Sequence, residues 1–353
     1  MGFQPEDIDD LNNLILPTIL MKDKWTDLSL SEQHLTVAER FLKNLKTDPV
    51  ASGPTQKWTI QTANTGSATW TDLFAQDTTA RANITLLASQ QWALATGNYT
   101  YDVREEEFQS DSRQVICDHL KVLAHSARTT ALYLFENALW SAPASSSTRP
   151  RKISGIPFWL QQNATEGFNA GNPTGFTDGA GNVTVAQCNN WRNWTGTYDS
   201  VSDDSLFAKM RTACRKTYFK APDPYPQATP QEPNWMFYTD STTLELAERA
   251  LNQQNDNIKD LSGFYGLSQF KNIKFDWVPV FETASSPAYV TNNPVYGINW
   301  STFQFQFQKG SALKFGKAHQ AMNCGHNVRQ VDWDATCNMK CLDRRSNFVF
   351  YKA

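Results

Sequence analysis

The chain has 353 residues, of which 40% are hydrophobic and 19% are charged, so it can bury a sizeable core and is not a disordered chain. This length suits two domains or one elaborated domain. The formal net charge of -3 argues against a protein whose main role is to hold nucleic acid through its phosphates.

The amino-terminal region predicts neither a secretory signal nor a membrane span. The first apolar run, residues 14–21, contains Pro17 and follows an acidic start without basic residues. No stretch approaches the roughly 20 apolar residues that a membrane-spanning helix needs. The six Cys residues have irregular spacings, which favours an intracellular product over a disulfide scaffold.

Residues 1–55 predict an arm made of short helices joined by extended chain. An amphipathic helix is expected after Ser31, and the triplet Thr47-Asp48-Pro49 should end it. Its expected apolar face consists of Leu35, Ala38, Phe41, Leu42 and Leu45. Such an arm has too little core of its own and needs another surface to lie on.

Residues 56–107 predict a long β-hairpin. The run at 58–62 and the stretch at 82–103 are rich in β-branched and aromatic residues. The pair Gly97-Asn98 is expected to form a bend or a bulge. Because a two-stranded hairpin is marginal in water, this one must also rest on another surface.

Residues 108–141 carry the longest helical pattern in the chain, with Ser110 or Asp111 as the N-cap and Pro143 beyond its end. The expected apolar face consists of Ile116, Leu120, Leu123, Ala127, Ala131, Leu134 and Ala138. Charged residues, Glu136 among them, are expected mostly on other faces. A helix of roughly 30 residues is about 45 Å long, so a long sheet or a neighbouring chain must cover it.

Residues 142–217 predict a loop-rich segment followed by a helix. ISGIPFWL (153–160) is expected as a short buried strand and RNWTGTYDSV (192–201) as another strand, with a turn at Asp178-Gly179. Asp203 or Asp204 should cap a helix that runs to Thr217. Its expected apolar stripe consists of Leu206, Met210, Ala213 and Cys214.

Residues 218–317 predict a compact α/β unit, and residues 318–353 predict further strands. Strands are expected at 234–240 and 271–281, separated by a helix that Ser241 or Thr242 caps. The period-two pattern of Phe and Gln at 303–308 predicts one buried and one solvated face. The last apolar strand should return into an earlier sheet.

The sequence contains no motif for a catalytic triad, a phosphate-binding loop, a dinucleotide fold or a zinc protease. One constellation could hold zinc: Cys324, His326, Cys337 and Cys341 supply four nitrogen or sulfur ligands. The alternative is that these thiols are buried in a β layer. We assign no catalytic, cofactor-binding or metal-binding residue and expect no enzyme.

The order of these elements resembles the Hong Kong 97 fold of the major capsid proteins of tailed bacteriophages. Four segments carry the resemblance in sequence: ISGIPFWL (153–160), RNWTGTYDSV (192–201), NPVYGINW (293–300) and DRRSNFVF (343–350). The resemblance covers most of residues 57–353. The four segments are packing motifs, so they do not identify a functional site.

The resemblance implies an α+β fold with five parts. These are an N-terminal arm (1–55), an extended loop (56–107), a peripheral domain with a spine helix (108–217), an axial domain (218–317) and return strands of the peripheral domain (318–353). It also implies self-assembly into pentamers and hexamers of an icosahedral shell around double-stranded DNA, without sequence-specific contacts. The expected location is the virion, after assembly in the host cytoplasm, and no membrane or cofactor is involved.

Two departures from relatives in that family lead to further expectations. Some relatives join their subunits through a Lys in the extended loop, but residues 58–107 here contain no Lys, so no such cross-link is expected. Some relatives carry a long amino-terminal scaffolding segment, and the arm here is too short for one. A separate scaffolding protein is therefore expected, together with a portal and, as an optional component, a decoration protein.

Two other classes remain open from the residues alone. The abundance of Trp, Asn and Thr would suit a carbohydrate-binding or tail-associated β-rich protein, although no internal repeat supports it. An enzyme with an unrecognised site is the third class, and no residue pattern favours it.

Overall fold

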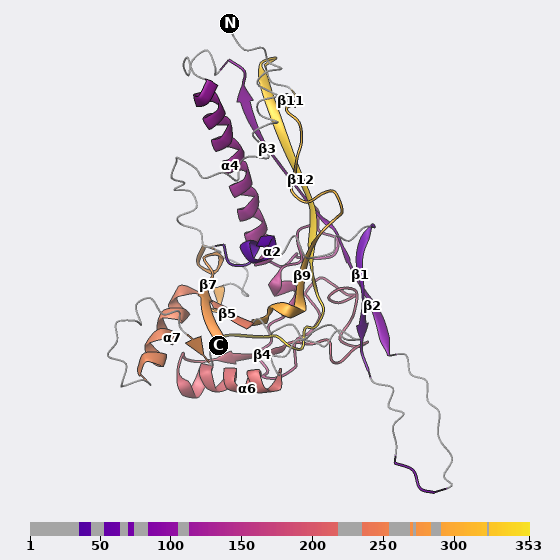
Figure 1. Ribbon diagram of the computed structural model, residues 1–353. Coiled ribbons are helices and arrows are strands. Elements are labelled where there is room, and N and C mark those ends of the chain that lie inside the picture. The colour runs from indigo at the N-terminus through magenta and orange to yellow at the C-terminus, as the bar shows by residue number, and fades with distance from the viewer. Residues whose placement is uncertain are drawn as a thin grey trace.

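The computed structural model describes residues 35–43, 53–63, 70–73, 84–104, 113–217, 235–253, 269–270, 273–283, 291–322 and 325–353. Within these residues the chain forms a two-stranded, a five-stranded and a six-stranded sheet together with several helices. The predicted α+β class is confirmed. An elongated upper part contains a long helix beside long strands, and the six-stranded sheet lies below it (Figure 1).

The five-stranded sheet is built around β12 (Val328–Cys341). Four strands run antiparallel to β12: β3 (Ala93–Asp102), β9 (Phe303–Phe307), β10 (Lys314–Phe315) and β11 (His319–Gln320). In the first half of β12 alternate residues, namely Val331, Trp333 and Ala335, are buried, whereas residues 335–339 are all buried. Period-two burial is what a sheet with one covered face produces.

The prediction of a bend or a bulge at Gly97-Asn98 is wrong. Both residues lie inside β3, and their pairing with β12 is continuous through Gly97↔Trp333 and Asn98↔Asp332. A Cβ atom on Gly97 would lie 2.6 Å from the indole of Trp333, so glycine is needed for close packing rather than for a turn. The strand is instead interrupted at Trp92, between β2 and β3.

The predicted hairpin is confirmed for β1 (Thr55–Gln61) and β2 (Thr85–Gln91), which pair antiparallel from Thr55↔Gln91 to Gln61↔Thr85. It does not extend over the whole of residues 56–107. Strand β3 continues from β2 but pairs with β12, so the carboxy-terminal part of the expected hairpin belongs to the five-stranded sheet. Figure 1 shows the hairpin projecting away from the long helix.

The long helix is confirmed as α4 (Arg113–Leu139), although its apolar face is rotated from the predicted one. Leu134, expected inside, is 48% exposed. The buried residues of the face are Leu120, Ala124, Ala127, Ala131, Phe135 and Leu139. Small Ala side chains let the helix approach β3 closely, and large Leu side chains do not by themselves mark the covered face. The predicted N-caps Ser110 and Asp111 lie outside the described residues.

The short helix α2 (Ala38–Lys43) is fixed to α4 by a buried carboxylate. Glu136 is 3% exposed and accepts hydrogen bonds from the backbone N–H of Ala38 at 2.7 Å and of Val37 at 3.1 Å. The Thr36 hydroxyl and the Trp140 indole N–H also donate to it. Glu136 therefore caps α2 from another helix, and its predicted place on a polar face is wrong.

The other side of α2 packs on aromatic residues. Phe41 stacks on Phe305 with centroids 5.3 Å apart and meets the edge of Trp300 at 5.4 Å. The Arg40 guanidinium lies 5.1 Å from the Trp300 ring and donates to the sulfur of Met236. This part of the arm thus lies on its own chain. The buried positions predicted for Ala38 and Phe41 are confirmed; Ser31, Leu45 and Thr47-Asp48-Pro49 lie outside the described residues.

The six-stranded sheet has the order β4-β13-β8-β5-β7-β6. Its strands are β4 (Trp194–Tyr198), β5 (Trp235–Thr239), β6 (Gln269–Phe270), β7 (Ile273–Trp277), β8 (Val295–Asn299) and β13 (Phe348–Lys352). The predicted return of the last strand is confirmed, since β13 pairs parallel with β4 and antiparallel with β8. The domain boundaries drawn after residues 217 and 317 stay predictions, but the strand pairing crosses both.

Helices α6 (Ala208–Lys216) and α7 (Ser241–Gln253) accompany this sheet (Figure 1). A π-helical turn, Asp203–Phe207, precedes α6, and Ser202 caps it where we expected Asp203 or Asp204. The predicted burial of Leu206, Met210 and Ala213 is confirmed, and Cys214 is half-buried. For α7 the carboxylate of Asp240 accepts from the N–H of Thr243, so the cap is one residue earlier than predicted.

Two further local predictions are corrected. ISGIPFWL contains a short helix, α5 (Ile156–Trp159), instead of a strand, because Pro157 in the first turn presets a helical φ angle. The run 293–308 enters two sheets, since a 3₁₀ turn (Trp300–Thr302) separates β8 from β9. Its three Phe residues are buried as predicted, but Gln306 is buried as well, because it pairs with the buried Asn338. A short helix, α8 (Val280–Thr283), follows β7.

The loop-rich segment before β4 is organised by the side chain of Arg344, which has no exposed surface. Its guanidinium donates to the carbonyl oxygens of Trp159 at 2.6 Å, Trp191 at 3.1 Å and Gly171 at 3.3 Å. It also lies 3.4 Å from the amide oxygen of Asn193. Burial lowers the pKa of Arg344 to about 10, so the group stays protonated at neutral pH.

Replacing Arg344 by Lys should destabilise the fold although the charge is kept. An ammonium cannot reach the same diverging carbonyls, and leaving buried acceptors unpaired should lower the free energy of unfolding by about 3 kcal/mol. Urea denaturation of the unassembled chain measures this loss.

The matched control is the same substitution at the next position. Arg345 lies 3.8 Å above the ring of Phe168 and is half-buried, so Arg345→Lys should lower the free energy of unfolding by only about 1 kcal/mol. Equal losses in the two variants would contradict this account of Arg344.

Candidate functional surfaces

The four residues that could have formed a zinc site do not come together in the structure. Cys337 and Cys341 are buried on β12 opposite Phe307 and Phe303, whereas His326 is exposed before the start of that strand. At about 3.3 Å per residue, the length of β12 separates His326 from Cys341 by roughly 40 Å. Cys324 lies outside the described residues. Among the residues that are described, no group of three His, Cys, Asp or Glu side chains could hold a metal ion.

The two β12 thiols are instead packed side chains, as the alternative interpretation held. Burial raises the pKa of Cys337 to about 12, and burial with the nearby Asp343 carboxylate raises the pKa of Cys341 as well. A thiol with so high a pKa is a poor nucleophile and a poor metal ligand at neutral pH. These residues contribute packing rather than chemistry.

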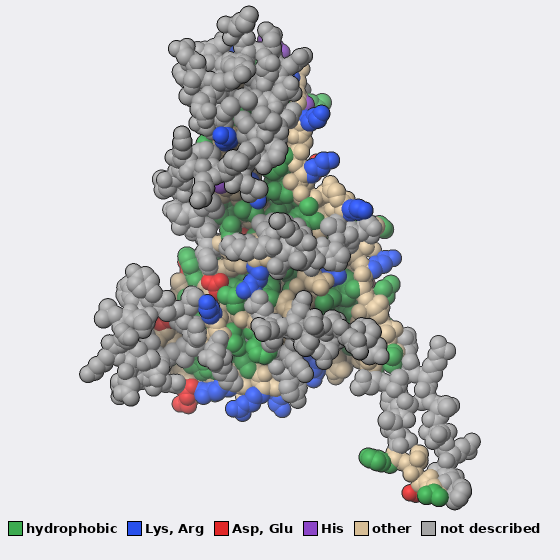
Figure 2. Space-filling model, in the orientation of Figure 1, with side chains coloured by type: hydrophobic (Ala, Val, Ile, Leu, Met, Phe, Trp, Pro, Cys, Tyr) green, Lys and Arg blue, Asp and Glu red, His purple; other side chains and the backbone are tan. Residues whose placement is uncertain are grey.

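Two of the three most exposed large apolar residues of the described chain lie in the loop between β1 and β2, and the third is Met322. Trp70 is fully exposed and Leu73 is 86% exposed. Figure 2 shows hydrophobic side chains at the far end of this projecting segment. Leu87 on β2 and Leu94 on β3 are also exposed. A large apolar side chain held fully in water marks a contact surface more often than a packing accident.

The outer face of α4 presents a second exposed surface. Val122, Ser126, Thr130 and Leu134 follow one another at intervals of four residues, and all four are exposed. None of them is charged, and the Thr130 hydroxyl donates to its own helix at the Ser126 carbonyl. This uncharged stripe lies on the side of α4 that β3 does not cover.

Most tryptophans in the described part of the chain are buried in the core. Eight of the twelve are buried: Trp58, Trp92, Trp140, Trp159, Trp191, Trp194, Trp300 and Trp333. Several pack against other aromatic rings, as Trp140 does against Tyr238 at 5.3 Å and Phe281 at 5.0 Å. Their abundance therefore reflects the core.

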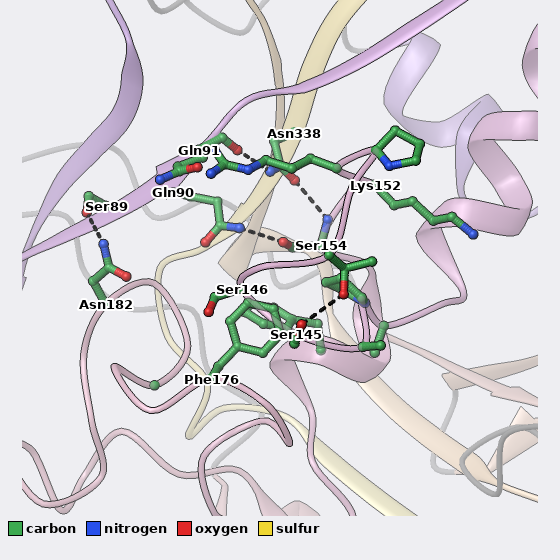
Figure 3. Close-up of a pocket in the computed structure, with 18 residues that line it drawn as sticks. Ser89, Gln90, Gln91, Ser145, Ser146, Lys152, Ser154, Phe176, Asn182 and Asn338 are labelled. Atoms are coloured by element: carbon green, nitrogen blue, oxygen red, sulfur yellow. Dashed lines mark hydrogen bonds between the residues drawn. The ribbon is translucent and has the colours of Figure 1, made fainter.

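A cleft of about 260 Å³ lies where the hairpin joins the rest of the molecule (Figure 3). Strand β2, the 142–154 segment and the 176–182 loop form its walls. Phe158 and Phe176 meet edge to face at 4.9 Å on one side. Among the described residues, the lining includes Arg151 and Lys152 but no Asp or Glu.

Hydrogen bonds from amide side chains connect the hairpin to β12 and to the loops that line the cleft. The amide group of Asn338 accepts from the Ser154 N–H at 2.9 Å and donates to the Gln91 carbonyl at 2.6 Å. Gln90 donates to the Ser154 hydroxyl, and Asn182 reaches Ser89 at 2.6 Å. In Figure 3 these pairs bridge β2 to the two loops across the cleft.

Neither a protein family model nor a curated protein sequence matches this chain. None of the helices in the described ranges has the length and apolar character that a membrane span requires.

Solved structures do match it along nearly its full length. The capsid asymmetric unit of cyanophage A-1(L) superposes with a TM-score of 0.58 at 13% identity, over 95% of this chain and 98% of that one. The capsid of a native GTA particle gives 0.54 at 10% identity, over 94% and 96%. The capsid of cyanophage P-SCSP1u gives 0.50 at 12% identity, over 95% and 93%. This chain has the fold of phage capsid proteins.

The buried thiol of Cys337 should resist alkylation in the native chain. With its raised pKa, the thiolate fraction at pH 8 is roughly a thousandfold below that of an ordinary thiol. Peptide mass spectrometry after iodoacetamide treatment should find Cys337 unmodified, while the same treatment in guanidinium chloride modifies it fully. Rapid labelling of the native chain would show that β12 is accessible.

Proposed function

We propose that this chain is the major capsid protein of a tailed bacteriophage, which self-assembles into the icosahedral shell around the double-stranded DNA genome. The observation that carries the proposal is the mutual coverage with a cyanophage capsid chain, 95% of this chain and 98% of that one at a TM-score of 0.58. Agreement over the whole of both chains leaves no large part of either fold without a counterpart. A structural, non-enzymatic role follows.

The exposed apolar surfaces support assembly from identical copies. The tip residues Trp70 and Leu73 and the outer stripe of α4 are surfaces that a single chain leaves in water. In a closed shell every copy presents the same surfaces to its neighbours, so each contact is made many times. Many weak contacts made together give a stable particle.

The parts of the Hong Kong 97 fold are assigned as follows in this proposal. Helix α4 is the spine helix of the peripheral domain, and the β1–β2 hairpin is the extended loop that overlaps a neighbour. Residues 1–55 form the N-terminal arm. Residues 218–317 supply most of the axial domain, which clusters around the five-fold and six-fold axes. Because β13 lies between β4 and β8, residues 318–353 contribute to both domains.

The proposal includes the partners that such a shell requires. Pentamers and hexamers of this chain form the wall, with a separate scaffolding protein, a portal and, as an optional component, a decoration protein. The packaged DNA is enclosed without sequence-specific contacts, which suits the net charge of -3. The mature location is the virion, after assembly in the host cytoplasm and without a membrane.

Expression of the chain alone and with candidate scaffolding proteins tests the function directly. Negative-stain microscopy of the sedimenting fraction should reveal shells, capsomer rings or tubes. A monomer that stays monomeric at high concentration under all these conditions would contradict the proposal.

Removing the apolar tip of the hairpin should block assembly without unfolding the chain. Because Trp70 and Leu73 bury nothing in the single chain, Trp70→Ser with Leu73→Ser should leave its melting temperature within about 1 °C of wild type. Sucrose-gradient sedimentation should show at least a tenfold loss of particles. Trp70→Phe, which keeps the apolar area, is the control and should assemble. Normal particle yield from the double variant would exclude the tip as a contact.

Mature particles should dissolve into single chains. Since residues 58–107 contain no Lys, and only Lys57 lies at the base of the hairpin, no isopeptide bond can start from the loop. Denaturing gels should therefore show one band at the mass of the monomer. A ladder of covalent oligomers would contradict this prediction.

A further inference from the structure

The cleft beside the hairpin is positively charged and its cations are not neutralised by the described residues. Arg151 is half-buried and Lys152 is exposed, and neither forms an ion pair within the described part of the chain. Arg149, on the same segment, donates to the carbonyls of Ser146 and Thr148. The 176–182 loop carries one acid, Asp178, which is exposed and does not belong to the lining. The cleft therefore favours a negatively charged occupant.

The lining of the cleft also specifies the kind of anion. Phe176 is half-buried and offers an apolar surface, while hydroxyl groups such as those of Ser145 and Ser146 stand beside it (Figure 3). A peptide with an apolar side chain flanked by carboxylates would match both the apolar surface and the positive charge of the cleft. An inorganic ion would leave the Phe176 ring uncovered, so an acidic peptide with one apolar residue fits better than a bare anion.

The chain itself contains such a peptide. Residues 6–10 are Glu-Asp-Ile-Asp-Asp, which places Ile8 between two pairs of carboxylates. They precede the first described residue, Leu35, by 25 positions. Fully extended, that length of chain spans up to about 85 Å. The segment therefore has the reach to enter the cleft of its own chain or of a neighbouring copy.

We propose that residues 6–10 bind in this cleft, with Ile8 against Phe176 and the carboxylates beside Arg151 and Lys152. The contact ties the amino-terminal arm to the root of the hairpin. It is independent of the proposed function, because it holds whether the chain is single or part of a shell.

Zero-length coupling with a carbodiimide tests the contact on the full chain. The reagent joins an amine to a carboxylate only when the two already touch, so the Lys152 amine should couple to the 6–10 carboxylates, as mass spectrometry of the digested protein would show. Mixing isotope-labelled and unlabelled chains tells whether the link forms within one copy or between two. Either result supports the proposal.

Charge variants decide whether the cleft directs the coupling. Arg151→Glu should lower the Lys152 yield at least tenfold, Arg151→Lys should retain it, and Arg151→Glu combined with Asp7→Arg and Asp9→Arg should restore much of it. Arg215→Glu at the exposed end of α6 is the control and should change nothing. Thermal melting of each variant checks that it is folded.

Three outcomes would overturn the proposal. The first is that Lys152 couples only to carboxylates outside residues 6–10, or does not couple at all. The second is an equal yield in Arg151→Glu and in wild type. The third is a duplex oligonucleotide retained by the wild-type chain but not by Lys152→Glu, without coupling to residues 6–10, which would assign the cleft to nucleic acid instead.

Discussion

The pairing of β12 with four other strands is the constraint on which the upper part of the molecule depends. At Arg329–Gln330 and at Trp333–Asp334 both edges of the strand are hydrogen bonded, to β3 on one side and to β11 or β10 on the other. Strand β3 lies more than 200 residues before β12 in the sequence, whereas β10 and β11 lie shortly before it. Because β12 is held in this way, α4 covers a continuous sheet. A helix that is too long for a small core to cover can therefore remain straight and partly buried.

Buried polar side chains hold the segments that have little regular structure. Arg344 donates to carbonyls at the end of α5 and at two loop positions, and Asn338 joins the hairpin to β12. Glu136 plays the same part for α2. In each case one side chain satisfies several backbone groups that no strand or helix partner reaches, which is how a loop can be buried without leaving polar atoms unpaired.

The sequence pattern predicted the long helix, most strands, the hairpin and the general order of the fold, because these follow from local periodicity. It did not predict the features that distant residues decide. Glu136 looked like a surface residue, since nothing near it in sequence shows that α2 will need a cap. Gly97 looked like a bend, since only the facing Trp333 shows why it has no side chain. The apolar tip at Trp70 carried no signal beyond composition, and the cleft could not be predicted because three separate segments form its walls.

The position of β13 has a consequence for how the protein is made. This strand lies inside the six-stranded sheet, between β4 and β8, although both are synthesised well before it. During translation β4 and β8 therefore lack the strand that lies between them until Phe348–Lys352 leaves the ribosome. Unpaired strand edges of this kind recruit foreign strands, so the nascent chain passes through a stage at which a chaperone has a specific place to act.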